Sequence, residues 1–302
     1  MADISTEYCG LQLKSPLMAS ASSLTGDLAT AKQLQSAGAA GIVLPSLFEE
    51  ELQHNPQRLH AYLDKIKSFK DSLDIPVVAS LNGVSDAGWL EHSESLEQAG
   101  CDALELNVYY IAADASESSD QIERKYINLV YKLRSQIRIP ISVKLTHQFS
   151  SVSNMVKRLE GTGIDGVVLF NRFYQPDIDL ESLTVTPTLS LSDASESLLR
   201  VRWIAMLRDQ VALSLCASGG FHCVDDIVKA LLVGADCVQL CSVLFQSGVD
   251  EVQRLLAGIQ HWLETSKFKS VKELQGQLSY ANLADPSGYE RQNYLQVLES
   301  NN

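Results

Sequence analysis

Short apolar runs alternate along this chain with segments of helical periodicity. Four runs share one form, in which a glycine that closes a helix precedes two residues, a small residue and a short apolar strand. They span 38–44, 100–106, 163–169 and 234–240. Four other apolar runs lie between them, at 15–20, 75–80, 139–144 and 212–216. Continuous apolar strands separated by helices are typical of parallel sheets, which are buried on both faces.

This repeat predicts a single-domain (β/α)₈ TIM barrel over residues 1–265, because eight strand–helix units in about 250 residues suit a closed barrel. A doubly wound open sheet is the alternative, but no Gly-x-Gly-x-x-Gly motif follows the first strand. Residues 266–302 are expected to form a C-terminal helix, opened by the capping pattern Ser270-x-x-Glu273, and a polar tail. The segment 171–192 is longer than an ordinary barrel loop, and such loops usually carry function or a small hairpin.

The seventh strand is followed by the paired glycines Gly219 and Gly220, and a helical pattern begins at Val224. Paired glycines let backbone N–H groups approach a ligand closely. In barrels a phosphate usually binds at the loops after strands 7 and 8, often beside a helix N-terminus. The pattern therefore predicts a phosphate site, although a Gly-Gly pair alone is equally typical of a tight turn.

Small or polar residues stand at the ends of the other strands, and these ends meet on the rim where barrels build their active sites. Lys144 is the most informative, because a charge inside an apolar strand needs a partner or a ligand. An Asn after a strand is often only a turn residue, but three of them at the rim favour a binding role. Asp102 and Glu105 are expected to support the barrel. The rim candidates are Ser20, Ala21, Ser46, Asn82, Asn107, Lys144, Asn171, Arg172, Gly219, Gly220, Cys241 and Ser242.

Composition narrows the choice of partners. The chain has 302 residues and a formal net charge of −13 without a basic patch, which argues against nucleic acid and anionic membranes. The N-terminus has no signal-peptide pattern, and no apolar run is long enough to span a membrane. Six cysteines without a C-x-x-C pair indicate free thiols in the cytoplasm, and six histidines show no metal-ligand spacing. We therefore expect a cytoplasmic protein with a small-molecule ligand and no metal.

Seven segments together carry a family resemblance over most of the chain, from about Leu11 to Leu263. They are 15–21, 43–50, 79–84, 104–107, 143–145, 169–177 and the glycine stretch 218–222. On these segments the chain resembles the dihydroorotate dehydrogenase family of flavoproteins, most closely its dihydroorotate dehydrogenase-like branch. The family reaction converts dihydroorotate to orotate in pyrimidine biosynthesis. A homodimer is expected only by analogy with the family.

The resemblance implies FMN as the cofactor. Its phosphate would bind at Gly219-Gly220 and the Cys241-Ser242 turn. Lys144 would lie beside the pyrimidine edge of the isoalloxazine, where a cation stabilises the negative charge that develops on reduction. Arg172 would suit a substrate carboxylate. The other implied cofactor contacts are Ser20, Ala21, Ser46, Asn82 and Asn107. The implied substrate contacts are Asn107 and Asn171.

Substrate residues of the family are changed in this chain. The family loop after strand 4 reads Asn-x-Ser-Cys-Pro-Asn, or has Ser for that Cys, and the Cys or Ser is the catalytic base. Here the loop reads Asn107-Val-Tyr-Tyr-Ile-Ala112, so Tyr110 stands at the base position and Ala112 replaces an Asn. Pro45 replaces a Lys. Two interpretations follow: an FMN oxidoreductase that acts on dihydroorotate or on another small substrate, or an inactive FMN-binding barrel with a binding or regulatory role.

Overall fold

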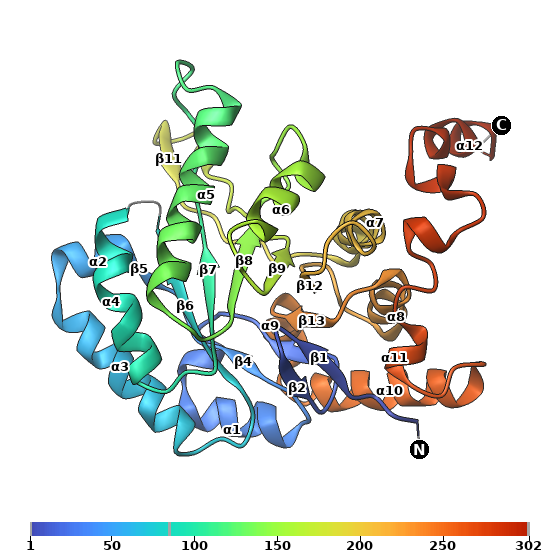
Figure 1. Cartoon of the computed structure of the whole chain (residues 1–302), viewed down its shortest axis with the longest axis horizontal. Helices are drawn as coiled ribbons and strands as arrows, with labels where there is room; N and C mark the ends of the chain where they lie inside the picture. The colour runs from blue at the N-terminus through green and yellow to red at the C-terminus, as the bar shows by residue number, and fades with distance from the viewer. Residues whose placement is uncertain (1, 84–85, 301–302) are drawn as a thin grey trace.

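The computed structural model describes residues 2–83 and 86–300, and within them eight parallel strands form a closed barrel (Figure 1). β4 pairs with both β3 and β6, which closes the sheet. The (β/α)₈ prediction is confirmed, and the strands fall on the eight predicted apolar runs. They are β3 (Leu17–Ala19), β4 (Ile42–Val43), β6 (Val77–Asn82), β7 (Ala103–Asn107), β8 (Ile141–Leu145), β9 (Gly166–Leu169), β12 (Ser214–Ser218) and β13 (Cys237–Leu240).

Helices surround the barrel because each buries an apolar stripe against the strands. In α8, for example, Ile227, Ala230 and Leu231 are completely buried. The helix ends at Gly234, whose φ of 115° is left-handed and suits glycine. The glycines that open the other three repeat runs also have positive φ. The helices are α1 (Leu28–Ser36), α2 (Glu49–His54), α3 (Gln57–Lys70), α4 (Asp86–Gln98), α5 (Ser119–Gln136), α6 (Val152–Glu160), α7 (Ser197–Leu207), α8 (Val224–Val233), α9 (Ser242–Ser247) and α10 (Glu251–Thr265).

The N-terminal segment packs against the chain that follows α10, near the N-terminal end of the strands. A hairpin of β1 (Thr6–Tyr8) and β2 (Leu11–Leu13) is fixed to the barrel by the Cys9 N–H, which donates to Ser214 Oγ at 2.9 Å. Helix α11 (Val271–Leu274) begins at Ser270, whose hydroxyl accepts from the Glu273 N–H, as the capping pattern predicts. The Val271 N–H donates to the Asp3 carbonyl.

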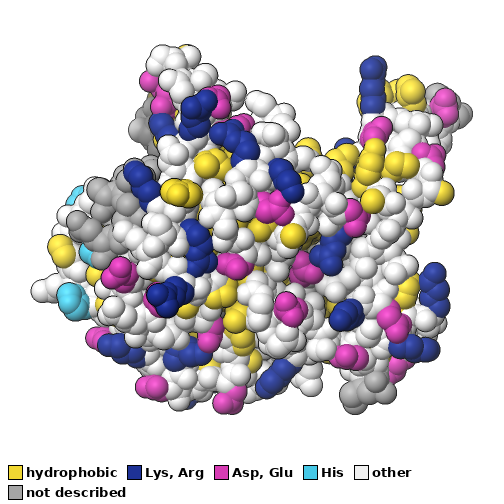
Figure 2. Space-filling view, in the orientation of Figure 1, with side chains coloured by type: hydrophobic (Ala, Val, Ile, Leu, Met, Phe, Trp, Pro, Cys, Tyr) yellow, Lys and Arg dark blue, Asp and Glu magenta, His cyan; other side chains and the backbone are white. Residues whose placement is uncertain are grey.

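The C-terminal segment beyond α11 first packs along α8 and α7, and its last helix projects from the barrel (Figure 1). It contains the short helices η3 (Tyr280–Asn282) and η4 (Pro286–Tyr289) and the final helix α12 (Gln292–Ser300). Figure 2 shows apolar side chains on this projecting arm, and basic and acidic side chains interspersed over the rest of the same face. Among the described helices, none combines the length and the apolar character needed to cross a membrane.

The long segment between β9 and α7 carries a hairpin, as expected for a loop of this length. Its strands are β10 (Asp177–Asp179) and β11 (Thr184–Thr186), and η2 (Ala194–Glu196) leads into α7. In Figure 1 this hairpin and the β1–β2 hairpin lie at opposite ends of the barrel strands. Two further short elements, β5 (Leu47–Phe48) and η1 (Leu24–Gly26), lie in the loops after β4 and β3. The rim at the carboxyl ends of the strands is thus the more elaborate end.

Candidate active site

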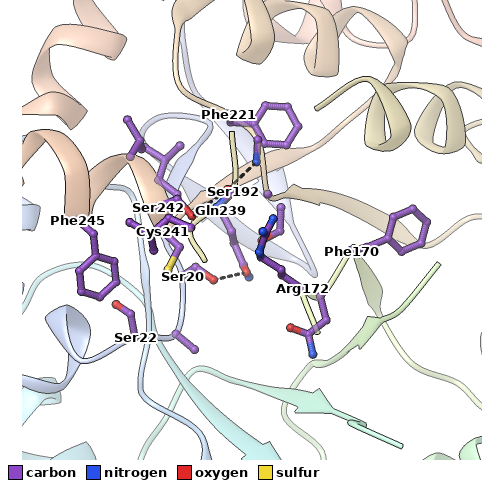
Figure 3. A pocket seen from close by; sticks show the side chains of 18 of the residues that line it. Ser20, Ser22, Phe170, Arg172, Ser192, Phe221, Gln239, Cys241, Ser242 and Phe245 are labelled. Carbon is purple, nitrogen blue, oxygen red and sulfur yellow. Dashed lines mark hydrogen bonds between the residues drawn. The ribbon is translucent and has the colours of Figure 1, made fainter. Parts of the chain in front are cut away.

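A cavity of about 290 Å³ opens at the carboxyl ends of β3, β8, β9, β12 and β13 (Figure 3). Its volume is at the lower end of the range for small-molecule sites. Most of the predicted rim residues line it: Ser20, Ala21, Lys144, Asn171, Arg172, Gly219, Gly220, Cys241 and Ser242. Ser46, Asn82, Asn107 and Tyr110 are not part of its wall. Three of these four, Ser46, Asn82 and Asn107, were expected to contact the cofactor, whereas Asn171 and Arg172, expected to contact a substrate, do line the cavity.

Gly219 and Gly220 line the cavity and have φ values of 92° and 90°. A Cβ at Gly220 would lie 2.4 Å from the backbone nitrogen of Ser197, and one at Gly219 would lie 2.8 Å from Arg200 Nη2. Both the left-handed backbone and these contacts require glycine. The glycine turn therefore packs closely against α7 while it lines the cavity.

One backbone N–H and two hydroxyls meet at this glycine turn. The Gly220 N–H donates to Ser192 Oγ at 3.2 Å, and the Ser192 hydroxyl donates to Ser242 Oγ at 2.8 Å. Ser192 was not predicted as a site residue, since its position at the end of the 171–192 segment gave no pattern of its own. These three groups can each turn a donor toward an anion. Asp226 accepts from the N–H groups of His222 and Cys223, which precede α8, at 3.3 Å, so those two donors are already engaged.

Lys144 lies inside the barrel and is almost fully buried. Its Nζ donates to Ser20 Oγ and Gln239 Oε1, both at 3.0 Å, and lies 3.4 Å from Glu105 Oε1. Gln239 Nε2 in turn donates to the other Glu105 oxygen at 2.6 Å. The three ammonium donors are therefore satisfied and the charge is balanced, as a buried cation requires.

Glu105 and Gln239 were not predicted as site residues. Gln239 could have been recognised, because it is a polar residue within the apolar run 234–240, the same signal that singled out Lys144. Glu105 was expected to support the barrel, and it does so as the counter-charge of Lys144. Asp102, expected in the same role, pairs with Lys70 at 2.7 Å and accepts from the Val77 N–H.

The three rim asparagines stand at the ends of β6, β7 and β9. Asn82 is paired in register with Asn107, and Asn107 with Lys144. Asn171 Nδ2 donates to Asn107 Oδ1 at 2.8 Å, which joins the ends of β7 and β9 across β8. Ser46 lies on the same side, where its hydroxyl bonds to Ser80 Oγ at 2.8 Å.

Tyr110 belongs to a separate charged cluster. Its hydroxyl donates to Glu117 Oε2 at 2.5 Å and accepts from Lys125 Nζ at 3.0 Å, and Nζ also lies 4.6 Å from the centre of its ring. Lys125 and Glu117 form an ion pair. The Lys125 ammonium and then the Tyr110 hydroxyl lower the pKa of Glu117 below its usual value. The phenol at the family's base position is thus a donor to a carboxylate outside the cavity wall.

The remaining groups at the cavity are held in their neutral or paired forms. Burial raises the pKa of the Cys241 thiol, and Lys144 offsets this only in part. Burial, followed by the charge of Arg200, also lowers the pKa of His147, which does not line the cavity. Arg172 forms an ion pair with Glu196 and donates to Ser190 Oγ at 3.2 Å. Over the described residues, no group of three or more His, Cys, Asp or Glu side chains is placed to hold a metal ion.

Comparison with known proteins identifies this architecture. A family model described as Dihydroorotate dehydrogenase matches residues 48–263, which is most of the chain. The dihydroorotate dehydrogenase B (NAD(+)) catalytic subunit of Thermoplasma acidophilum is 23% identical, over 91% of this chain and 99% of the relative. Dihydroorotate dehydrogenase A (fumarate) of Lactobacillus delbrueckii subsp. bulgaricus is 25% identical, over 90% of this chain and 97% of the relative. The chain belongs to the dihydroorotate dehydrogenase family.

Proposed function

We propose that this protein is an FMN-dependent oxidoreductase of the dihydroorotate dehydrogenase type whose substrate differs from dihydroorotate. The observation that carries the proposal is the placement of one buried cation, Lys144, on the wall of a cavity that the Gly219-Gly220 turn also lines. A glycine turn suits a ligand with a phosphate group. A buried positive charge in the same cavity suits a ligand that becomes negative on reduction. FMN has both properties.

The phosphate of FMN would be held by the Gly220 N–H and the hydroxyls of Ser192 and Ser242. These groups already converge on one point, and each has a donor that can be redirected. Ser20, Ala21 and Cys241 would line the remainder of the site. Because burial keeps the Cys241 thiol protonated, it would contribute an uncharged surface rather than a nucleophile.

Bound FMN supplies the capacity to accept or donate a hydride. The protein contribution is electrostatic. Lys144 is excluded from water, so its positive charge acts strongly on negative charge that develops nearby. Of the three partners of Lys144 Nζ, Ser20 and Gln239 line the cavity, whereas Glu105 does not. Ser20 and Gln239 are therefore the partners that could exchange a bond to Lys144 for one to a ligand.

Oxidation of dihydroorotate requires a base that removes a proton from carbon. Tyr110 is the residue at the family's base position, and its hydroxyl is engaged by Glu117 and Lys125 outside the cavity wall. Ala112 and Pro45 lack the polar groups that the family places near its substrate. A small molecule other than dihydroorotate, one suited to Asn107 and Asn171, is the expected substrate.

A flavin-binding barrel without turnover is the second candidate. It is favoured by the bond between Asn107 and Asn171, which engages the Asn107 carbonyl oxygen and an Asn171 N–H that would otherwise face a substrate. The two candidates differ in one measurable property. A catalyst, once its flavin is reduced, is reoxidised by a physiological substrate at a rate above that of free FMN, whereas an inactive binding protein is not. In either case the six cysteines, all free in the structure, suit the cytoplasm.

The cofactor assignment is tested by purification and reconstitution. We expect a yellow protein with about one FMN per chain, or a colourless one that takes up FMN when it is supplied. Binding is measured by the quenching of flavin fluorescence on titration with protein. A folded protein that cannot take up FMN would contradict the assignment.

A further inference from the structure

Two arginines share one carboxylate beside the glycine turn. Arg172 Nη1 forms an ion pair with Glu196 Oε1, and Arg200 Nη2 lies 3.4 Å from Glu196 Oε2. Two cations therefore face this one carboxylate. The Ser195 hydroxyl and N–H, and then the charge of Arg172, lower the pKa of the other nearby carboxylate, the exposed Asp193.

This cluster of Arg172, Arg200 and Glu196 is adjacent to the glycine turn, where we place the phosphate. Arg200 Nη2 is the atom nearest to where a Cβ of Gly219 would be, and the nitrogen of Ser197, which follows Glu196, is nearest to that of Gly220. Arg172 Nη2 donates to Ser190 Oγ at 3.2 Å, two residues before Ser192, whose hydroxyl accepts from the Gly220 N–H. The two partners of Arg172 are thus close in sequence to Ser192 and Ser197, the residues that approach Gly220.

The two arginines differ in their freedom to move. Arg200 is 5% exposed, and its Nε and Nη1 donate to the carbonyls of Ser218 and Glu196 at 3.0 and 2.8 Å. Arg172 is 31% exposed and lies on the cavity wall, held only by side chains. If Arg172 released Glu196, Arg200 would still balance that carboxylate. Arg172 alone can therefore change partner without leaving a buried charge unpaired.

We propose that Arg172 binds the phosphate of the cofactor, exchanging Glu196 for the phosphate oxygens. Guanidinium groups pair bidentately with phosphate, and such charge-assisted bonds are about twice as strong as neutral ones. The backbone N–H and two hydroxyls at the turn carry no charge, so a dianionic phosphate there needs a cation. This assignment rests on the proposed FMN function, and it differs from the substrate-carboxylate role expected for Arg172 from the sequence.

The test compares FMN with riboflavin, which lacks the phosphate. For Arg172→Gln we expect FMN to bind at least tenfold more weakly than to the unmodified protein, while the riboflavin dissociation constant changes by less than twofold. Arg172→Lys keeps the charge and should recover part of the FMN affinity. Arg254→Gln is the matched control, because Arg254 also pairs with a glutamate, Glu251, but does not line the cavity. It should leave both constants unchanged.

Each other result counts against the proposal in a distinct way. An unchanged FMN constant, or an equal loss for FMN and riboflavin, would show that Arg172 does not recognise the phosphate. Unchanged FMN binding with weakened binding of orotate, used as an anionic probe, would return Arg172 to a substrate role. If the unmodified protein binds neither flavin, the proposed function fails first and this assignment with it.

Discussion

The proposed cofactor side and the proposed substrate side of the rim are built differently. At the cofactor side, Lys144, Glu105 and Gln239 are buried on strands and bonded to one another across the barrel. At the substrate side, the loop after β7 leaves Ile111 59% exposed and bonds Tyr110 to Glu117 within the same loop. A buried network changes only at a large energetic cost, whereas a surface loop can change freely. One fold can therefore keep a cofactor while its substrate changes.

The largest expected effect is at the glycine turn. Gly220→Ala should lower FMN affinity by about 100-fold or more, since the new Cβ would lie 2.4 Å from the Ser197 nitrogen and displace the turn. Gly100→Ala is the control: its φ of 92° matches that of Gly220, but nothing lies within 4 Å of a Cβ there. The control should lose a little thermal stability, because alanine is strained at this positive φ. Its FMN affinity, measured by fluorescence titration, should stay normal. Equal FMN binding in both variants would mean that the turn is not the phosphate site.

The second-largest effect is expected at Lys144, where a substitution should reduce FMN affinity less than Gly220→Ala does. Lys144→Met leaves Glu105 without its counter-charge, and breaking a buried pair costs about 3–5 kcal/mol of unfolding free energy. It should also lower the midpoint potential of bound FMN by about 30 mV or more, the equivalent of a tenfold change for a two-electron couple. Chemical denaturation and redox titration measure the two effects.

The double variant Lys144→Met with Glu105→Gln separates these two contributions. It removes both charges, so it should regain most of the lost unfolding free energy while the potential stays low. If the potential returned to that of the unmodified protein, Lys144 would have no electrostatic contact with the flavin.

The smallest effect is expected at Tyr110. Tyr110→Phe should leave FMN affinity unchanged and lower the melting temperature slightly at neutral pH. The hydroxyl helps to hold the pKa of Glu117 below its usual value, so its stabilising contribution is present above the unfolded glutamate pKa. It disappears as the pH falls through the lowered pKa in the folded state. Thermal melts at neutral and acidic pH measure this, and a large loss of flavin binding would place Tyr110 in the cavity after all.

The sequence predicted the barrel well because its signals are local and repeated. The four glycine-led runs mark strands whose burial and spacing depend on nearby residues alone, and Lys144 stood out inside one of them. Ser192 and Arg200 could not be found in this way. Ser192 reaches Gly220 only because the 171–192 segment folds back over the rim, and Arg200 reaches Gly219 only through the packing of α7 on β12. Such contacts depend on tertiary structure and leave no periodic pattern.

The central claim, a kept cofactor site beside a changed substrate site, is tested most directly by adding dihydroorotate to the FMN-loaded protein without oxygen. The flavin absorbance reports whether reduction occurs, and dithionite added afterwards shows that the flavin can be reduced. We expect the flavin to stay oxidised, or to bleach no faster than free FMN, until dithionite is added. Rapid bleaching by dihydroorotate, at a rate proportional to protein concentration, would contradict the account and show that a working base and substrate site remain.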